Sequence, residues 1–202
     1  MDFYKVLETI GLVVGLLYLI LIIKENIWCW IFGIIGSAIT VFLYFHTKLY
    51  LESILNAYYI LSGIYGWWYW LNAKEKSDKA NVPVVRWKPT YHILNIIVCL
   101  LLSVGVGFLM KKYTDSPRPF VDATIAIFSF SATYLEARKV LSAWTYWFII
   151  NAASIALQFD RGLTIYAYLS IVYTIMSVVG YFQWKKSYDN QNFSGILSKK
   201  ES

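Results

Sequence analysis

The chain has few charged residues and few of the side chains that bind metals. Only 15% of its 202 residues are charged, and it contains two cysteines and two histidines. A soluble domain of this length needs more polar surface than that. Cys29 and Cys99 both fall inside long apolar stretches, where a buried apolar role is more common than a disulfide or a metal site. We therefore predict no metal and no cofactor.

Sequence motifs of membrane enzymes and pumps are also absent. No G-x-x-x-x-G-K-[ST] loop occurs, so the phosphate cradle of an ATP-driven pump is missing. His46 and His92 stand singly at the ends of apolar stretches, without the clustered ligands or the nucleophile that hydrolysis needs. These absences predict that the protein is not an enzyme.

Seven apolar stretches of about 16 to 22 residues fill nearly the whole chain. They are Val6–Ile23, Ile27–Phe45, Tyr50–Leu71, Ile93–Met110, Phe120–Leu135, Trp144–Phe159 and Leu163–Phe182. A helix that crosses the hydrocarbon needs about 20 residues, and barrel strands would show ~10-residue alternation instead. With a mean hydropathy of +0.52, the sequence predicts an all-α polytopic membrane protein whose seven transmembrane helices form a bundle in the lipid bilayer.

Basic residues are distributed unequally between the two ends of these stretches. With seven crossings, the side that carries the N-terminus holds six of the 18 basic residues and the opposite side holds twelve. Positive charge is enriched on the cytoplasmic side, which predicts an N-out, C-in topology. Because topology accounts for the net charge of +6, no nucleic-acid partner is inferred.

An internal repeat relates the first three stretches to the last three. A shift of 114 residues without a gap aligns acidic, basic, glycine and tryptophan positions in one register. The aligned pairs include Glu8 with Asp122, Lys24 with Arg138, Trp30 with Trp144, Gly66 with Gly180 and Trp70 with Trp184. This predicts a 3+1+3 parallel-repeat arrangement, with a pseudo-two-fold axis along the membrane normal and a substrate path between the halves. The parts are residues 1–71 (first repeat), 72–119 (cytoplasmic loop, linker helix and outer loop), 120–184 (second repeat) and 185–202 (cytoplasmic polar tail).

One face of the sixth stretch combines aromatic and amide groups. Trp144, Trp147 and Asn151 are spaced i, i+3 and i+7, which places them within about 60° on a helix. Further polar side chains at similar depth are Asn56, Ser170 and Ser37. Because a polar group in the bilayer needs a partner, these residues are expected to face a wet cavity and bind a solute. The alternative is that the amides join helices and the tryptophans anchor at the interface.

Three carboxylates lie near the predicted outer ends of the first, third and fifth stretches. They are Glu8, Glu52 and Asp122. At the mouth of a path they would attract a cation. They are equally well explained as acids that stabilise helix N-termini. No acidic or basic residue is expected deep in the bundle, since Glu136 lies at a helix end, and this argues against proton or sodium coupling.

Three motifs closely resemble those of the PnuC-type vitamin transporters. These are Trp144-x-x-Trp147-x-x-x-Asn151, the run Ile64-Tyr65-Gly66-Trp67 and Pro119-Phe120-x-Asp122. The resemblance covers essentially the whole chain. It implies facilitated diffusion of nicotinamide riboside across the bacterial inner membrane, with thiamine carried by relatives, and it places the aromatic and amide motif on Trp144, Trp147 and Asn151. The chain departs from that pattern at Asn56, where a glutamine is expected, and at Gly36, near a second amide position.

The expected function is therefore uniport of nicotinamide riboside, driven by a cytoplasmic kinase that phosphorylates the arriving vitamin. Thiamine is the alternative substrate, and both are cationic small molecules that an indole face attracts. A seven-helix receptor or sensor is a more distant alternative, although the seventh stretch has no lysine for a retinal Schiff base. The oligomeric state, including a homo-oligomer, is left open.

Overall fold

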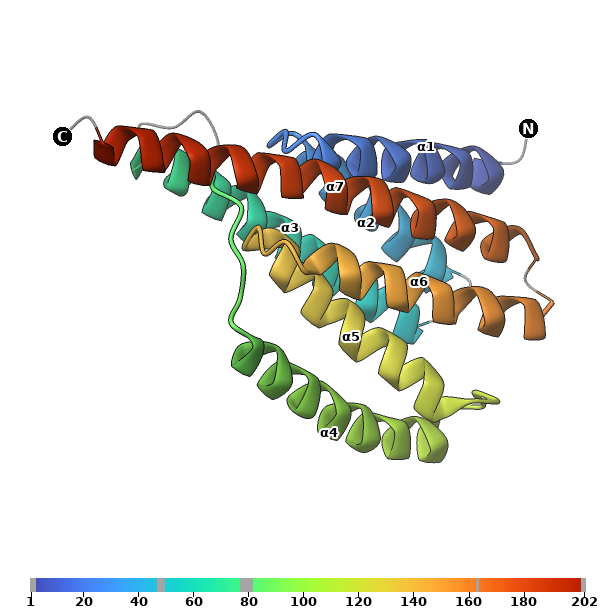
Figure 1. Ribbon diagram of the computed structural model, residues 1–202. Helices are drawn as coiled ribbons and strands as arrows, with labels where there is room; N and C mark the ends of the chain where they lie inside the picture. Colours follow the sequence, from blue (N-terminus) through green and yellow to red (C-terminus); the bar gives the residue numbers. More distant parts are fainter. Residues whose placement is uncertain (1–2, 47–49, 77–81, 163, 201–202) are drawn as a thin grey trace. The chain divides into compact units, whose positions relative to one another are not determined.

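The computed structural model describes residues 3–46, 50–76, 82–162 and 164–200, and within these ranges the chain forms seven helices (Figure 1). In chain order they are α1 Phe3–Ile23, α2 Cys29–His46, α3 Tyr50–Lys76, α4 Pro89–Tyr113, α5 Pro119–Ala137, α6 Ala143–Asp160 and α7 Thr164–Lys200. Each predicted stretch is thus a helix. Leu163, at which the seventh stretch was expected to begin, lies outside the described residues, as do 77–81 of the expected cytoplasmic loop.

The largest difference from the expected boundaries is at the C-terminus. The segment expected to be a polar tail after Trp184 continues α7 as far as Lys200. No proline follows Pro119 in the sequence, so nothing in that segment removes a helical hydrogen bond. Lysine and glutamine continue a helix readily when it leaves the apolar region. Polarity therefore marks the end of the apolar stretch and does not mark the end of the helix.

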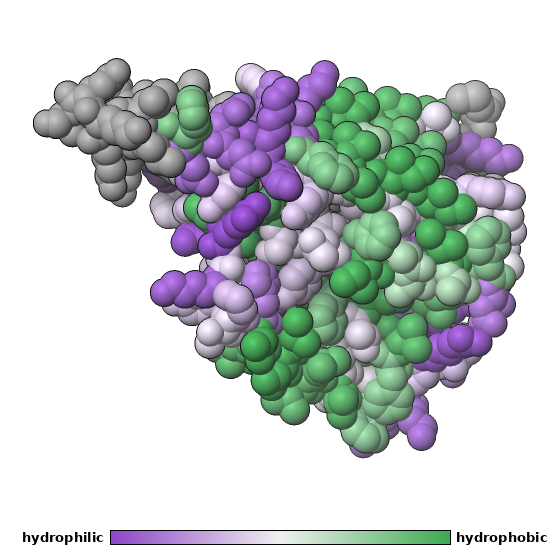
Figure 2. Space-filling view, viewed as in Figure 1, coloured by the Kyte–Doolittle hydropathy of each residue, from purple (hydrophilic) through white to green (hydrophobic). Residues whose placement is uncertain are grey.

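Three helices, α1, α2 and α4, are long and apolar enough to cross a membrane by length and composition, among the residues that the structure describes. The other four, α3, α5, α6 and α7, interrupt their apolar stretches with tyrosines, tryptophans, serines, threonines or amides. Figure 2 shows apolar side chains gathered over α1 and α4 on the visible face. Most candidate site residues lie on the four more polar helices, whereas Ser37 lies on α2 and Glu8 on α1.

The chain divides into two compact units, each built largely around one repeat. Unit 1 contains α1 to α3, the turn at residues 137–139 and the chain from residue 183 onward. In it α1 packs on α2 and α2 on α3. Trp30 is 1% exposed and covers Gly66, where a Cβ atom would lie 2.5 Å from the indole. Glycine at this position lets the two helices approach closely.

Unit 1 also contains a buried ion pair. The Lys139 Nζ donates to Glu25 Oε2 at 2.6 Å and to the Val82 carbonyl at 2.9 Å, and it lies 4.4 Å from the centre of the Trp70 ring. Lys139 is fully buried. Burial lowers the pKa of its ammonium, and the Glu25 carboxylate opposes that change. The expectation concerned charged residues deep in the bundle, whereas this pair lies at the turns after α1 and α5, where other parts of the unit cover it.

Unit 2 contains α4, α5, α6 and α7 as far as Phe182, with the segment from Val85 that precedes α4. Leu135, Val140 and Ala143 form a buried cluster at the α5–α6 turn. Val85 forms an isolated parallel bridge with Val140 beside this cluster. At the other end of α4 the Phe120 ring fills the space above Gly107. These contacts hold α4 and α5 together at both ends.

The duplication expected from the sequence is confirmed by the local structure of the two repeats. Adding 114 to the bounds of α2, 29 and 46, gives 143 and 160, the bounds of α6. Glu25 and Lys139, one repeat apart, both have positive φ, at 57° and 52°. Trp144 covers Gly180 as Trp30 covers Gly66, with 2.6 Å between the indole and an added Cβ. Two copies of one three-helix motif therefore share the bounds of the second helix, the end of the first, the start of the third and the tryptophan–glycine contact.

Candidate functional site

The candidate site lies on α6, close to the start of the helix. Trp144, Trp147 and Asn151 all belong to unit 2, and they share one side of α6 as their spacing predicts. Their environments differ. Trp144 is buried, whereas Trp147 and Asn151 are half-buried. The side chains on this face that a solute can reach are therefore those of Trp147 and Asn151.

Trp144 has a packing contact of its own. Its indole covers Gly180 of α7, so that a Cβ atom there would lie 2.6 Å from three ring carbons. Only 1% of the residue is exposed. This contact repeats the one between Trp30 and Gly66 in unit 1. The tryptophan–glycine pair accordingly supports helix packing, and a direct contact of Trp144 with a solute stays a prediction.

Trp147 is held by a buried carboxylate. Its Nε1–H donates to Glu136 Oε2 at 3.2 Å. Glu136 is 2% exposed and lies near the end of α5. An indole has one donor, and a hydrogen bond to it fixes the plane of the ring. The hydrogen bond thus orients an aromatic face beside a carboxylate, a combination that attracts cations.

An amide extends the same face of α6 towards its C-terminal end. Gln158 follows Asn151 by seven residues and Trp147 by eleven, so at 100° per residue the three lie within about 40° of one another. The Gln158 Oε1 accepts a hydrogen bond from Ser170 Oγ of α7 at 2.8 Å. Ser170 is therefore brought to this face through an amide that was not predicted, and its role in binding stays a prediction. Asn151 lies between the aromatic end and the amide end.

A second polar group of side chains joins α4, α5 and α6. Asn95 donates from Nδ2 to Ser131 Oγ at 2.7 Å and to the Tyr146 hydroxyl at 3.2 Å. The Tyr146 hydroxyl shares a further hydrogen bond with His92 Nδ1 at 3.3 Å. Because Tyr146 precedes Trp147, it projects about 100° away from the α6 face described above. This network fixes the back of α6 against α4 and α5.

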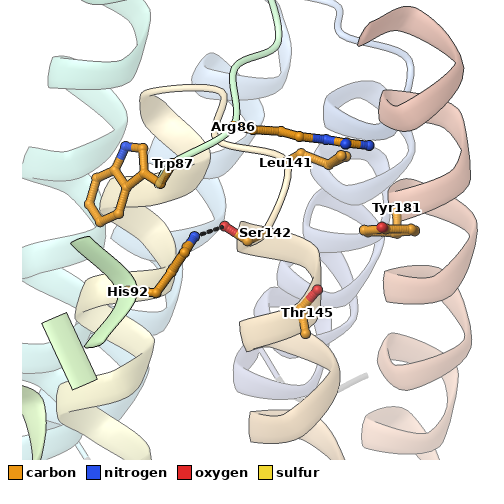
Figure 3. A pocket seen from close by; sticks show the side chains of 7 residues that line it. All are labelled: Arg86, Trp87, His92, Leu141, Ser142, Thr145 and Tyr181. Atoms are coloured by element: carbon orange, nitrogen blue, oxygen red, sulfur yellow. Dashed lines mark hydrogen bonds between the residues drawn. The ribbon is translucent and has the colours of Figure 1, made fainter. Parts of the chain in front are cut away.

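An open pocket of about 200 Å³ lies beside this network in unit 2. It is lined by Arg86, Trp87, His92, Leu141, Ser142, Thr145 and Tyr181. Figure 3 shows His92 pointing to Ser142, with 3.3 Å between Nε2 and Oγ. None of the predicted site residues lines it. The pocket is therefore distinct from the face formed by Trp147, Asn151 and Gln158.

The remaining predicted polar residues belong to unit 1. Ser37 on α2 and Asn56 on α3 are both half-buried. Glu8 on α1 is exposed, and among the described residues it has no ion-pair partner. The side chain of Glu52 lies outside the described residues. Their roles as binding and entrance residues stay predictions.

Asp122 differs from Glu8 because its charge is already paired. Arg161 donates from Nη2 to both carboxylate oxygens of Asp122, at 2.8 and 2.9 Å. Ser116 also donates to this carboxylate. A neighbouring pair joins Arg118 to Asp160 at 2.8 Å. These bonds connect the start of α5 to the end of α6, so Asp122 has a structural role in addition to the predicted one.

Sequence reasoning missed Glu136 and Gln158 as parts of the face. Gln158 was detectable, since it lies seven residues after Asn151 on the same side of one helix. Glu136 was noted only as a residue at a helix end. The repeat offered a signal, because its counterpart 114 residues earlier is the apolar Ile22. A carboxylate that replaces a buried isoleucine requires a partner, and Trp147 supplies one.

Comparison with known proteins gives concordant results for family and fold. A family model described as "Nicotinamide mononucleotide transporter" matches residues 5–186. The nicotinamide riboside transporter PnuC of Escherichia coli is 23% identical over 206 aligned residues, which cover 90% of this chain and 85% of the relative. The riboflavin/roseoflavin transporter RibM of Streptomyces davaonensis is 24% identical, with 88% of this chain and 83% of the relative covered.

A solved structure has the same fold. The crystal structure of the vitamin B3 transporter PnuC superposes with a TM-score of 0.73 at 21% sequence identity, over 91% of this chain and 82% of the other. The resemblance seen in the tryptophan and asparagine motif is thus confirmed across the whole helical bundle. The chain belongs to the nicotinamide mononucleotide transporter family and is a multi-pass protein of the bacterial inner membrane.

Proposed function

We propose that the protein is a uniporter that carries nicotinamide riboside into the cell and is not an enzyme. The observation that carries the proposal is the α6 face, where the half-buried Trp147 is oriented by the buried carboxylate of Glu136. Nicotinamide riboside has a permanently cationic pyridinium ring. Both an indole face and a nearby carboxylate attract such a cation in a site that excludes water.

The amides of the same face suit the polar groups of this vitamin. Asn151 and Gln158 each provide one acceptor and two donor hydrogens. A carboxamide and ribose hydroxyls need both kinds of partner. The relatives named as nicotinamide riboside transporters support the choice of substrate at the level of the family. Ser37 and Asn56 of unit 1 remain proposed contributors of further polar groups.

Facilitated diffusion is the proposed mode of transport. The sequence has no phosphate-binding loop to use ATP. Glu25 is paired with Lys139, and Glu136 accepts a hydrogen bond from Trp147. We assign these buried carboxylates to structure and to solute binding, and none to ion coupling. Net uptake then requires a cytoplasmic kinase that converts the vitamin into a phosphorylated form, which the transporter does not return.

Specific observations support two other vitamins as alternative substrates. Thiamine carries a cationic thiazolium ring, to which the Trp147 and Glu136 pair is equally suited. Riboflavin is uncharged, and a relative named as a riboflavin/roseoflavin transporter is 24% identical. Riboflavin would use the aromatic face and the amides without the carboxylate. The charge of the preferred solute therefore separates the candidates.

A binding titration of the purified protein identifies the substrate. Nicotinamide riboside, thiamine, riboflavin and nicotinamide are added in parallel, and binding is read from the quenching of tryptophan fluorescence. We expect the tightest binding for nicotinamide riboside. Preferential binding of riboflavin would contradict the proposal, and preferential binding of thiamine would favour the alternative cation.

Transport into proteoliposomes then tests the mode. With the membrane potential clamped to zero, the vitamin should equilibrate and stop, with or without a proton or sodium gradient. The clamp is necessary because a potential of 100 mV contributes ~2.3 kcal/mol per charge. Enclosing a kinase and ATP should convert equilibration into accumulation of the phosphorylated product. Accumulation of the unmodified vitamin under an ion gradient would contradict uniport.

A further inference from the structure

The proposed function does not yet explain what the negative charge of the buried Glu136 does. Its carboxylate is 2% exposed and lies near the end of α5, and it accepts the Trp147 Nε1–H at 3.2 Å. Burial of a carboxylate is costly unless it has partners or offsets another charge. The carboxylate lies against the ring edge of Trp147, the half-buried tryptophan of the α6 motif. We therefore ask what a negative charge at this position does.

The repeat shows that the fold does not need an acid at this position. The equivalent position in the first repeat is Ile22, which is 0% exposed. Ile22 and Glu136 occupy the same turn of α1 and α5, one residue before the helix ends at Ile23 and Ala137. Packing alone is therefore satisfied by an apolar side chain. The acid in the second repeat accompanies Trp147, and the first repeat has Gly33 in its place.

We infer that Glu136 is a specificity-determining residue that makes the transporter prefer cationic solutes over neutral solutes of the same shape. A cation over the Trp147 ring lies within about 6 Å of the ring centre. The carboxylate is at the edge of that ring, 3.2 Å from Nε1. In a buried site the attraction between the two charges is weakly screened. The hydrogen bond also holds the ring in the orientation that presents its face.

This inference rests on the proposed transport of a cationic vitamin, and it adds the residue that selects the charge. Two effects of the carboxylate are separable by substitution. Glu136→Gln keeps an oxygen that accepts the indole N–H but removes the negative charge. Glu136→Ala removes both. A charge-selecting role and a positioning role therefore predict different results for the glutamine variant.

The experiment uses matched solutes that differ in charge. Dissociation constants of the full-length purified protein are measured for nicotinamide riboside and for its dihydro form, which has an uncharged ring. Thiamine and an uncharged analogue with a carbocyclic or thiophene ring form a second pair. Wild-type protein, Glu136→Gln and Glu136→Ala are compared. Asp189→Asn, which removes an exposed carboxylate of α7, is the matched control.

We expect wild-type protein and the Asp189→Asn control to prefer the cation. In Glu136→Gln that preference should fall by roughly tenfold, with affinity for the neutral solute retained, because a buried charge pair is replaced by a neutral hydrogen bond. Glu136→Ala should weaken the binding of both solutes. In the double variant with Trp147→Phe, which lacks the indole N–H, the effects of the two substitutions should not be additive.

The outcomes distinguish this inference from the proposed function. An unchanged cation preference in Glu136→Gln, in a protein that binds nicotinamide riboside, overturns the inference and leaves the proposed function intact. Equal losses for both solutes in Glu136→Gln show a role in positioning alone and also overturn it. A wild-type protein that binds neutral vitamins only overturns both the inference and the proposed function.

Discussion

The two three-helix repeats have the same scaffold but differ in the residues near α6. Both place a buried tryptophan, Trp30 or Trp144, over a glycine of the third helix in the repeat. Both end their first helix with a turn that contains a residue of positive φ. Features that survive in both copies are those that the fold needs. Features found in one copy only are therefore the better candidates for function.

The main difference is an exchange of large and small residues. In the first repeat the Tyr18 ring lies on Gly33, so that a Cβ atom there would be 3.0 Å from the ring. The corresponding residues of the second repeat, 114 positions later, are Ala132 and Trp147. The large aromatic side chain is on the first helix in one copy and on the second helix in the other. At this position the second repeat has the half-buried indole of Trp147. The first repeat has Gly33, which the Tyr18 ring covers.

The largest predicted effect concerns a position where the two copies carry opposite charges. Glu25 and Lys139 are equivalent in the repeat, and they pair with each other inside unit 1. Lys139→Ala leaves the Glu25 carboxylate buried without its cation, so the free energy of unfolding should fall by about 3–5 kcal/mol. Thermal unfolding in detergent measures the loss.

Two double variants sharpen that result. Exchange of the two residues, Glu25→Lys with Lys139→Glu, restores a pair and should recover most of the stability. Glu25→Leu with Lys139→Met replaces the pair by apolar side chains and should also be more stable than Lys139→Ala. If Lys139→Ala were as stable as the wild-type protein, the buried pair would have no role in folding.

The binding site gives the next largest effect. Trp147→Ala removes the oriented ring that distinguishes the second repeat, and affinity for the vitamin should fall by about 30-fold or more, as for a buried aromatic contact. Stability should fall less than in Lys139→Ala, since Trp147 is half-buried and the Glu136 carboxylate loses a neutral hydrogen bond. Phe148→Ala, which removes an exposed neighbouring aromatic residue, is the control for binding. Equal losses of binding and of thermal stability would assign Trp147 to packing.

The sequence predicted the seven helices well because each contains an apolar stretch of about 16 to 22 residues, close to the ~20 that cross a membrane. The repeat was predictable because tryptophan, glycine and charged positions coincide without gaps. The pairing of Glu25 with Lys139 was not predictable. Both residues lie next to helix ends, and hydropathy does not reveal that a turn is covered by Trp70 and Val82. The bond between Glu136 and Trp147 joins two helices, so periodicity along one helix could not show it.

A smaller effect is expected at the glycines that both copies share. Gly66→Ala and Gly180→Ala place a Cβ atom 2.5 and 2.6 Å from an indole. Each should therefore lower the free energy of unfolding by about 1–3 kcal/mol through overpacking. The control is Gly105→Ala in α4, where an added Cβ meets nothing within 4 Å and should stabilise the helix slightly. Thermal unfolding measures the loss in each variant. A loss of stability in only one of Gly66→Ala and Gly180→Ala would show that the two contacts are not equivalent.

The smallest effect concerns the equivalent acids Glu8 and Asp122. Glu8 is exposed, whereas Asp122 is paired with Arg161 at 2.8 Å. If acids at this end attract the solute, Glu8→Gln should slow the association of cationic nicotinamide riboside about twofold at low salt, and added salt should remove the difference. Asp122→Asn combined with Arg161→Gln removes one charge of each sign, so the association rate should not change. Stopped-flow tryptophan quenching measures both rates. A slower association in the double variant, with no effect of Glu8→Gln, would show that the paired acid guides the solute and that the exposed acid does not.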